Sequence, residues 1–95
     1  MIIPDAFRQL VMWFDHEIAA VIPEAKADSI GFALNAVSAA ERASVFRFLT
    51  DALASMTAPG QLEAMFVASN TRTAFYSEMD LRLFLAEIVR RIGVM

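Results

Sequence analysis

The chain of 95 residues carries a net charge of −3, one histidine and no cysteine. The lack of cysteine excludes disulfides, thiol nucleophiles, iron–sulfur clusters and cysteine-ligated zinc. A nucleic-acid-binding domain needs clustered basic side chains to displace counterions, and eight cationic residues in an acidic chain argue against that class of partner.

The hydropathy pattern and the N-terminus predict a cytoplasmic protein. The longest stretch without a charged residue, from Ser29 to Ala40, has twelve residues, whereas a membrane-spanning helix needs about 20. The opening MIIPD has no basic residue before its apolar pair, so it does not resemble a secretory signal. We therefore expect no membrane association. The high alanine content, and arginine at seven of the eight cationic positions, are typical of a GC-rich bacterial genome.

Apolar side chains are in surplus for a chain of this length. They make up 58% of the residues, against a usual value of about 45–50%, and eight of them are phenylalanine. A domain of this size hides only about 60–65% of its unfolded surface when it folds. We therefore expect a partner or a second copy of the chain to cover part of the apolar surface.

Apolar residues recur at intervals of three and four, which predicts an all-α fold. The first helix is expected from Pro4 to Ile22, with Pro23 at its end. Its core face would consist of Phe7, Leu10, Val11, Phe14, Ile18, Val21 and Ile22. A shorter helix, from about Ala27 to Val37, is expected to follow a cap at Asp28 or at a nearby residue and is weakened by Gly31.

Three further helices are expected in the second half of the chain. Ser38 and Glu41 fit a capping box, which begins a helix that reaches residue 55 or 56. The segment TAPG, residues 57–60, precedes a short helix that ends near Ser69, and the last helix runs from Ser77 to the Arg-Arg-Ile before Gly93. The prediction is a single helical domain, residues 1–95, built as a compact bundle of about five helices, three longer and two short.

The only Trp and the only His lie in the segment WFDHE, residues 13–17. Consecutive helical residues are about 100° apart, so Asp15, His16 and Glu17 cannot chelate one ion together. The positions three and four residues from His16 hold no metal ligand, and no nucleophile partners it at helical spacing. We therefore predict no metal, no cofactor and no catalytic residue, with His16 on a solvated helix face.

Large apolar side chains also occur outside the expected core faces. Met12 and Trp13 lie off the core stripe of the first helix, next to His16, and Met79 and Leu83 lie opposite the core stripe of the last helix. They form either a second layer of core, in a bundle whose helices are flanked on two sides, or a surface for a partner. Trp and Met are enriched where proteins recognise one another. The candidate partner-binding residues are Met12, Trp13, His16, Met79 and Leu83.

The segment SNTRT, residues 69–73, is the densest group of hydrogen-bonding side chains. Arg72 and Tyr76 are candidate polar contacts for a ligand with a phosphate or a carboxylate. Asn and Thr are equally typical of a plain connection between helices. Charged side chains elsewhere are expected to pair along their helices, Glu78 with Arg82 and Glu87 with Arg91.

These observations favour a non-enzymatic interaction protein. It would self-associate, most simply as a homodimer, or cap a protein partner as an adaptor, an inhibitor or an immunity-type protein. An enzyme is disfavoured because no convergent titratable groups are visible by spacing. The alternative is a binder of a small apolar ligand, held between helices in a cavity lined by Phe and Met and oriented by His16, Tyr76 or Arg72.

Overall fold

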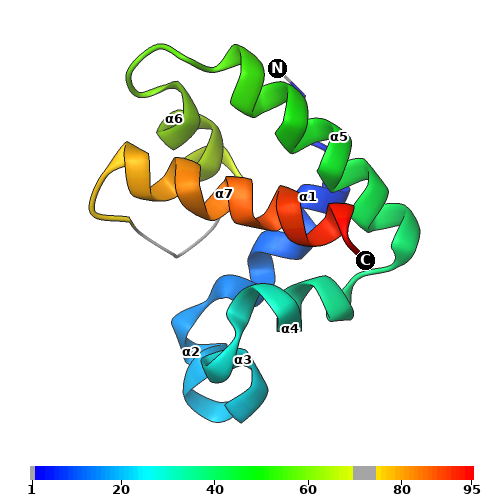
Figure 1. The fold of residues 1–95 in the computed structure, drawn as a ribbon. Helices are drawn as coiled ribbons and strands as arrows, with labels where there is room; N and C mark the ends of the chain where they lie inside the picture. Colours follow the sequence, from blue (N-terminus) through cyan, green and yellow to red (C-terminus); the bar gives the residue numbers. More distant parts are fainter. Residues whose placement is uncertain (1, 70–74) are drawn as a thin grey trace.

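A computed structural model describes residues 2–69 and 75–95, and these residues form helices and no β-strand (Figure 1). The all-α prediction is therefore confirmed. The two longest helices, α5 (Ala39–Ser55) and α7 (Glu78–Gly93), pack against each other. Helix α1 (Asp5–Val11) packs on α5 and on α4 (Ser29–Ala36), and α6 (Gln61–Ala68) packs on α7. No helix in the described part of the chain is long and apolar enough to cross a membrane.

The prediction of one continuous helix from Pro4 to Ile22 is wrong. Helix α1 is followed by the 3₁₀ turn η1 (Met12–Phe14), and Asp15 then adopts an extended backbone with φ −66° and ψ 131°. Its carboxylate accepts a hydrogen bond of 2.8 Å from the backbone N–H of Glu17, which begins α2 (His16–Val21). Aspartate competes in this way with the helical backbone, so it favours a cap over a helix interior.

A further short helix, α3 (Pro23–Ala27), begins where the sequence predicted only a break, because proline suits the first position of a helix. In Figure 1, α2 and α3 form a lobe at the bottom of the view, at the far end of the molecule from α6. The described residues thus contain seven α-helices, five of them seven residues or longer, where about five helices were predicted.

The break at Asp15 also divides the expected apolar stripe. Phe7, Leu10 and Phe14, before the break, are buried in the core. Val21, on the far side of the break, is 77% exposed. The rotation of the chain at the cap therefore takes Val21 away from the core, while Ile18 and Ile22 are half-buried.

The other expected helix starts are confirmed. Asp28 accepts the N–H of Gly31, both bonds of the capping box of Ser38 and Glu41 are present, and Ser77 accepts the N–H of Asp80. In each case the donor and the acceptor lie three residues apart, so the sequence alone carries the signal.

The core is formed by the inner faces of α1, α4, α5, α6 and α7. Its largest fully buried apolar side chains are Phe7, Leu10, Val11, Leu34, Val45, Leu49, Leu62, Leu85 and Ile88. Burying one such side chain is worth about 1.5–3 kcal/mol. Helix α7 contributes Leu81, Leu85 and Ile88 to this core, which fixes which of its faces points inward.

Three arginines, Arg8, Arg42 and Arg82, close the C-terminal ends of α6, α4 and α5. Arg42 donates from Nη1 to the carbonyls of Leu34 and Val37, both at 2.8 Å, at the end of α4. Arg8 donates to the carbonyl of Ala68, the last residue of α6, at 3.0 Å. The last carbonyls of a helix have no partner within the helix, and a cation there also complements the helix dipole.

The predicted ion pair of Glu78 with Arg82 is replaced by two longer-range caps. Arg82 donates to the carbonyls of Leu53 at 3.1 Å and Met56 at 2.6 Å, at the end of α5. Glu78 accepts the backbone N–H groups of Gly60 at 2.9 Å and Glu63 at 3.2 Å, at the start of α6. These bonds hold the pKa of Glu78 below its ordinary value. Glu78 and Arg82 therefore bond to the ends of neighbouring helices rather than to each other, and these bonds connect α7 to α5 and α6.

We predict that Arg82→Met lowers the free energy of unfolding by about 1–3 kcal/mol, because two partly buried carbonyls lose their donors. Arg47→Met, which changes an exposed arginine on α5, is the matched control and should have little effect. Denaturant unfolding of both variants measures the difference. Equal stabilities for the two variants would show that the Arg82 cap is not stabilising.

Candidate functional site

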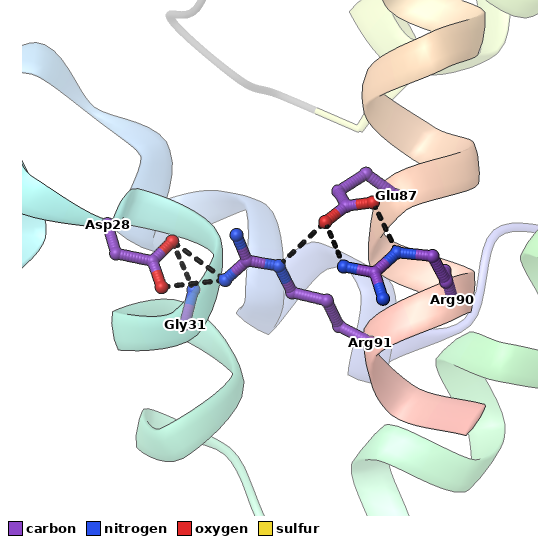
Figure 2. Close-up of polar contacts among 5 residues, drawn as sticks. All are labelled: Asp28, Gly31, Glu87, Arg90 and Arg91. Carbon is purple, nitrogen blue, oxygen red and sulfur yellow. Dashed lines mark hydrogen bonds and ion pairs between the residues drawn. The ribbon is translucent and has the colours of Figure 1, made fainter. Parts of the chain in front are cut away.

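A group of four charged side chains joins the end of α7 to the start of α4, and Figure 2 shows it. Arg91 donates from Nη1 to both carboxylate oxygens of Asp28, at 2.8 and 2.6 Å, and from Nε to Glu87 at 2.9 Å. Arg90 donates from Nε and Nη2 to the same Glu87, at 2.7 and 2.6 Å. The predicted pair of Glu87 with Arg91 is therefore present, as part of a larger network that we call the Arg91 cluster, made of Asp28, Glu87, Arg90 and Arg91.

The carboxylates of the Arg91 cluster are held in the ionised form. Hydrogen bonds from Arg90 and then Arg91 lower the pKa of Glu87 to about 2. The hydrogen bond from Arg91, followed by that from the N–H of Gly31, lowers the pKa of Asp28 below its ordinary value. A carboxyl group that acts as a general acid or base near neutral pH needs a raised pKa. The chemistry of this cluster is therefore structural: it ties the cap of α4 to the last turns of α7.

The two aromatic candidates in the first half of the chain differ in their surroundings. Trp13 packs edge-on against Phe32 of α4, with ring centroids 5.6 Å apart, and lies against the core. The indole is therefore partly covered by the chain itself, as a second layer of core would be. His16 begins α2, its side chain is 77% exposed, and its Nδ1 lies 3.8 Å from the Asp15 carboxylate.

Met79 and Leu83 occupy the outer face of α7. Their exposed fractions are 62% and 61%, whereas Leu81 and Leu85 of the same helix are buried. The helical angle of about 100° per residue also places Ala86 and Arg90 on this face. Both are exposed. The sequence pattern already placed Arg90 beside Met79 and Leu83, whereas sequence reasoning missed Ala86. The signal was present, since Ala86 follows Leu83 by three residues and Arg90 follows Ala86 by four.

Met12 is exposed to the same degree, 61%, but it lies on η1 rather than on α7. The predicted partner-binding residues are thus distributed over two regions of the chain. Two of them, Met79 and Leu83, share one helix face. The contribution of Met12, Trp13 and His16 would come from the junction of α1 and α2.

Tyr76 is fully exposed and lines a surface cavity of about 200 Å³ beside the start of α7. Phe66, Val67 and Phe75 form part of its wall. Cavities that hold drug-sized ligands usually have volumes of about 300–1,000 Å³, so this one suits only a small group. The other candidate polar contact, Arg72, lies outside the described residues.

Within residues 2–69 and 75–95, no three Asp, Glu or His side chains gather as metal ligands. No family model matches this chain, and neither the curated proteins nor the solved structures include a significant match to it. Any functional assignment therefore depends on the surface and the chemistry described above.

We predict that Gly31→Ala gives none of the stabilisation that this change usually brings inside a helix, about 0.5–1 kcal/mol. A Cβ at residue 31 would collide with the carboxylate of Asp28 and lie 3.4 Å from Nη1 of Arg91. In an Asp28→Ala background the collision is gone, and the same change should stabilise the protein. Denaturant unfolding of the parent, the two single variants and the double variant measures this. An equal gain in unfolding free energy from Gly31→Ala in both backgrounds would rule out the clash.

We also predict that acidification weakens the Arg91 cluster. A carboxylate with a lowered pKa adds stability above its unfolded-state pKa and loses that contribution as the pH falls through its folded-state value. For Glu87 this window runs from about pH 4.5 down to about 2. Arg91→Met should be less stable than the parent at pH 7 and should lose less stability across the window. Parallel pH profiles from denaturant unfolding would contradict this.

Proposed function

We propose that this protein is a non-enzymatic, cytoplasmic protein–protein interaction module, and that the outer face of α7 is its main binding surface. The observation that carries the proposal is the exposure of Met79 and Leu83, at 62% and 61%, on a helix whose opposite face is buried in the core. Recognition between helices uses apolar side chains at such spacings, with one helix face laid against a groove or another helix. The surplus of apolar residues in the composition supports the same conclusion.

The electrostatics support a non-enzymatic role. The resolved pKa shifts of carboxyl groups, at Asp28, Glu41, Glu78 and Glu87, are all downward and arise from hydrogen bonds. These groups are ionised at neutral pH, so they are poor proton donors and weak bases. The bonds to Asp28, Glu41 and Glu78 fix helix starts, and those to Glu87 are ion pairs along α7, which explains the shifts without catalysis.

A protein partner fits the surface better than a nucleic acid, because the chain is acidic and its exposed helix face is apolar. The module would act by covering or joining proteins, either another copy of itself or a second protein, as an adaptor, an inhibitor or an immunity-type protein does. Met12 and His16 are additional candidate contacts because both are exposed. Trp13 would contribute only the part of its ring that Phe32 leaves uncovered.

The alternative, a binder of a small apolar ligand, is supported by the cavity beside Tyr76 with its Phe66 and Phe75 wall. We rank it second because that cavity measures only about 200 Å³, and the two larger hollows, about 320 Å³ beside Met65 and about 310 Å³ beside Phe46, are wide open to solvent. The exposed face of α7 would also stay unexplained by such an activity.

We predict that a photo-reactive amino acid placed at residue 83 cross-links to protein in intact cells. Residue 51, which is also exposed but lies on α5, serves as the control position. Cross-linked bands, identified by mass spectrometry, should form from position 83 far more than from position 51. A chain that forms no protein adduct at position 83, or equal amounts at both positions, would contradict an interaction surface on α7.

A further inference from the structure

The outer face of α7 has a symmetric spacing. Met79, Leu83, Ala86 and Arg90 follow one another at intervals of four, three and four residues. At about 100° per residue, the four positions fall within an arc of about 60°. All four are exposed, and the side chain of Arg90 is 62% exposed.

Because these intervals are the same from either end, a second α7 that runs in the opposite direction matches the first. Met79 of each copy would then lie opposite Arg90 of the other, and Leu83 opposite Ala86. A large side chain would meet a small one at both central positions, which allows two helices to interdigitate closely. An isologous two-fold interface requires this kind of self-complementarity, whereas an unrelated partner does not.

The charges along α7 favour the same antiparallel arrangement. Asp80 lies in the first turn of the helix and Arg90 in the last turn. In an antiparallel pair, Asp80 of one copy lies beside Arg90 of the other, and the two helix dipoles oppose each other favourably. Arg90 uses Nε and Nη2 to bind Glu87, which leaves Nη1 for another acceptor. A parallel pair would instead place like charges side by side.

We infer that the partner of this face is a second copy of the same chain, with the two α7 helices packed antiparallel about a two-fold axis between residues 84 and 85. This inference rests on the proposed function, an interaction surface on α7, and it identifies the protein that binds there. The contact from Met79 to Arg90 is about 17 Å long, which places it among the smaller interfaces. The dimer is therefore expected to dissociate in the micromolar range.

Sedimentation equilibrium of the purified chain over a concentration series tests this directly. The parent chain should pass from one to two chains in mass as its concentration rises, and Leu83→Arg should raise the dissociation constant by at least about tenfold. Val67→Arg is the matched control, since Val67 is 67% exposed on α6 and its change adds the same charge. A monomeric parent at high micromolar concentration, or a dimer lost in Val67→Arg and kept in Leu83→Arg, overturns the inference.

A charge exchange tests the antiparallel register. Asp80→Arg and Arg90→Glu should each weaken the dimer, because each places like charges together across the interface. The double variant restores opposite charges between copies and should recover most of the lost affinity. Circular dichroism confirms that each variant is folded. If the double variant dimerises no better than the weaker single variant, the antiparallel register is wrong.

Failure of this inference can be told apart from failure of the proposed function. If the purified parent is monomeric while residue 83 cross-links to a different protein in cells, the dimer is excluded and the interaction surface remains. If the parent is monomeric and residue 83 forms no adduct, both are excluded. A dimer that is lost in Leu83→Arg, together with cross-links between copies from residue 83, supports both.

Discussion

The shortness of its helices is the constraint that governs this structure. Five of the seven α-helices described have eight residues or fewer. Each helix leaves four N–H groups at its start and four carbonyls at its end without a partner in the helix. In a helix of eight residues, half of the backbone donors and half of the acceptors therefore need partners from elsewhere. Polar side chains meet part of that need, as Asp28, Ser38 and Arg82 do, whereas α1 and α3 begin without a side-chain cap.

Helix α7 shows how this requirement shapes the molecule. Its first residue, Glu78, caps α6, while Arg82 closes α5 and Arg91 binds the cap residue of α4. Its apolar inner face is buried among the same neighbours, so capping and core packing fix its position together. Only the outer face, with Met79 and Leu83, is left without a partner in the described part of the chain. The proposed recognition surface is thus the face of α7 that neither packs on nor caps another helix in the described part of the chain.

Sequence reasoning succeeded where the interacting groups are close in the chain. The caps at Asp28, Ser38 and Ser77 involve an N–H three residues away, and residue type and spacing were sufficient to predict them. The angle of Met79 and Leu83 to the core stripe placed them opposite that stripe, but it left open whether they are exposed or form a second layer of core. The all-α fold followed from the apolar period.

Sequence reasoning failed at the local cap of Asp15 and at contacts between distant parts of the chain. Apolar residues continue at helical spacing through Asp15, so the pattern gave no sign that its side chain would cap and end the helix there. The bond from Arg91 to Asp28 spans 63 residues, and no local pattern encodes it. The position of Phe32 beside Trp13 likewise depends on how α4 folds back on η1. These last two contacts join elements whose relative placement only the folded chain determines.

Methionine oxidation offers the most direct test of the claim that capping leaves α7 with a free apolar face that a second copy covers. Met79 and Met12 are almost equally exposed, at 62% and 61%, but only Met79 lies on that face. We predict that a brief pulse of hydroxyl radicals, read by mass spectrometry, oxidises the two residues similarly in dilute protein. As the concentration rises, Met79 should become protected while Met12 does not. Oxidation of Met79 that stays proportional to that of Met12 at every concentration would contradict this.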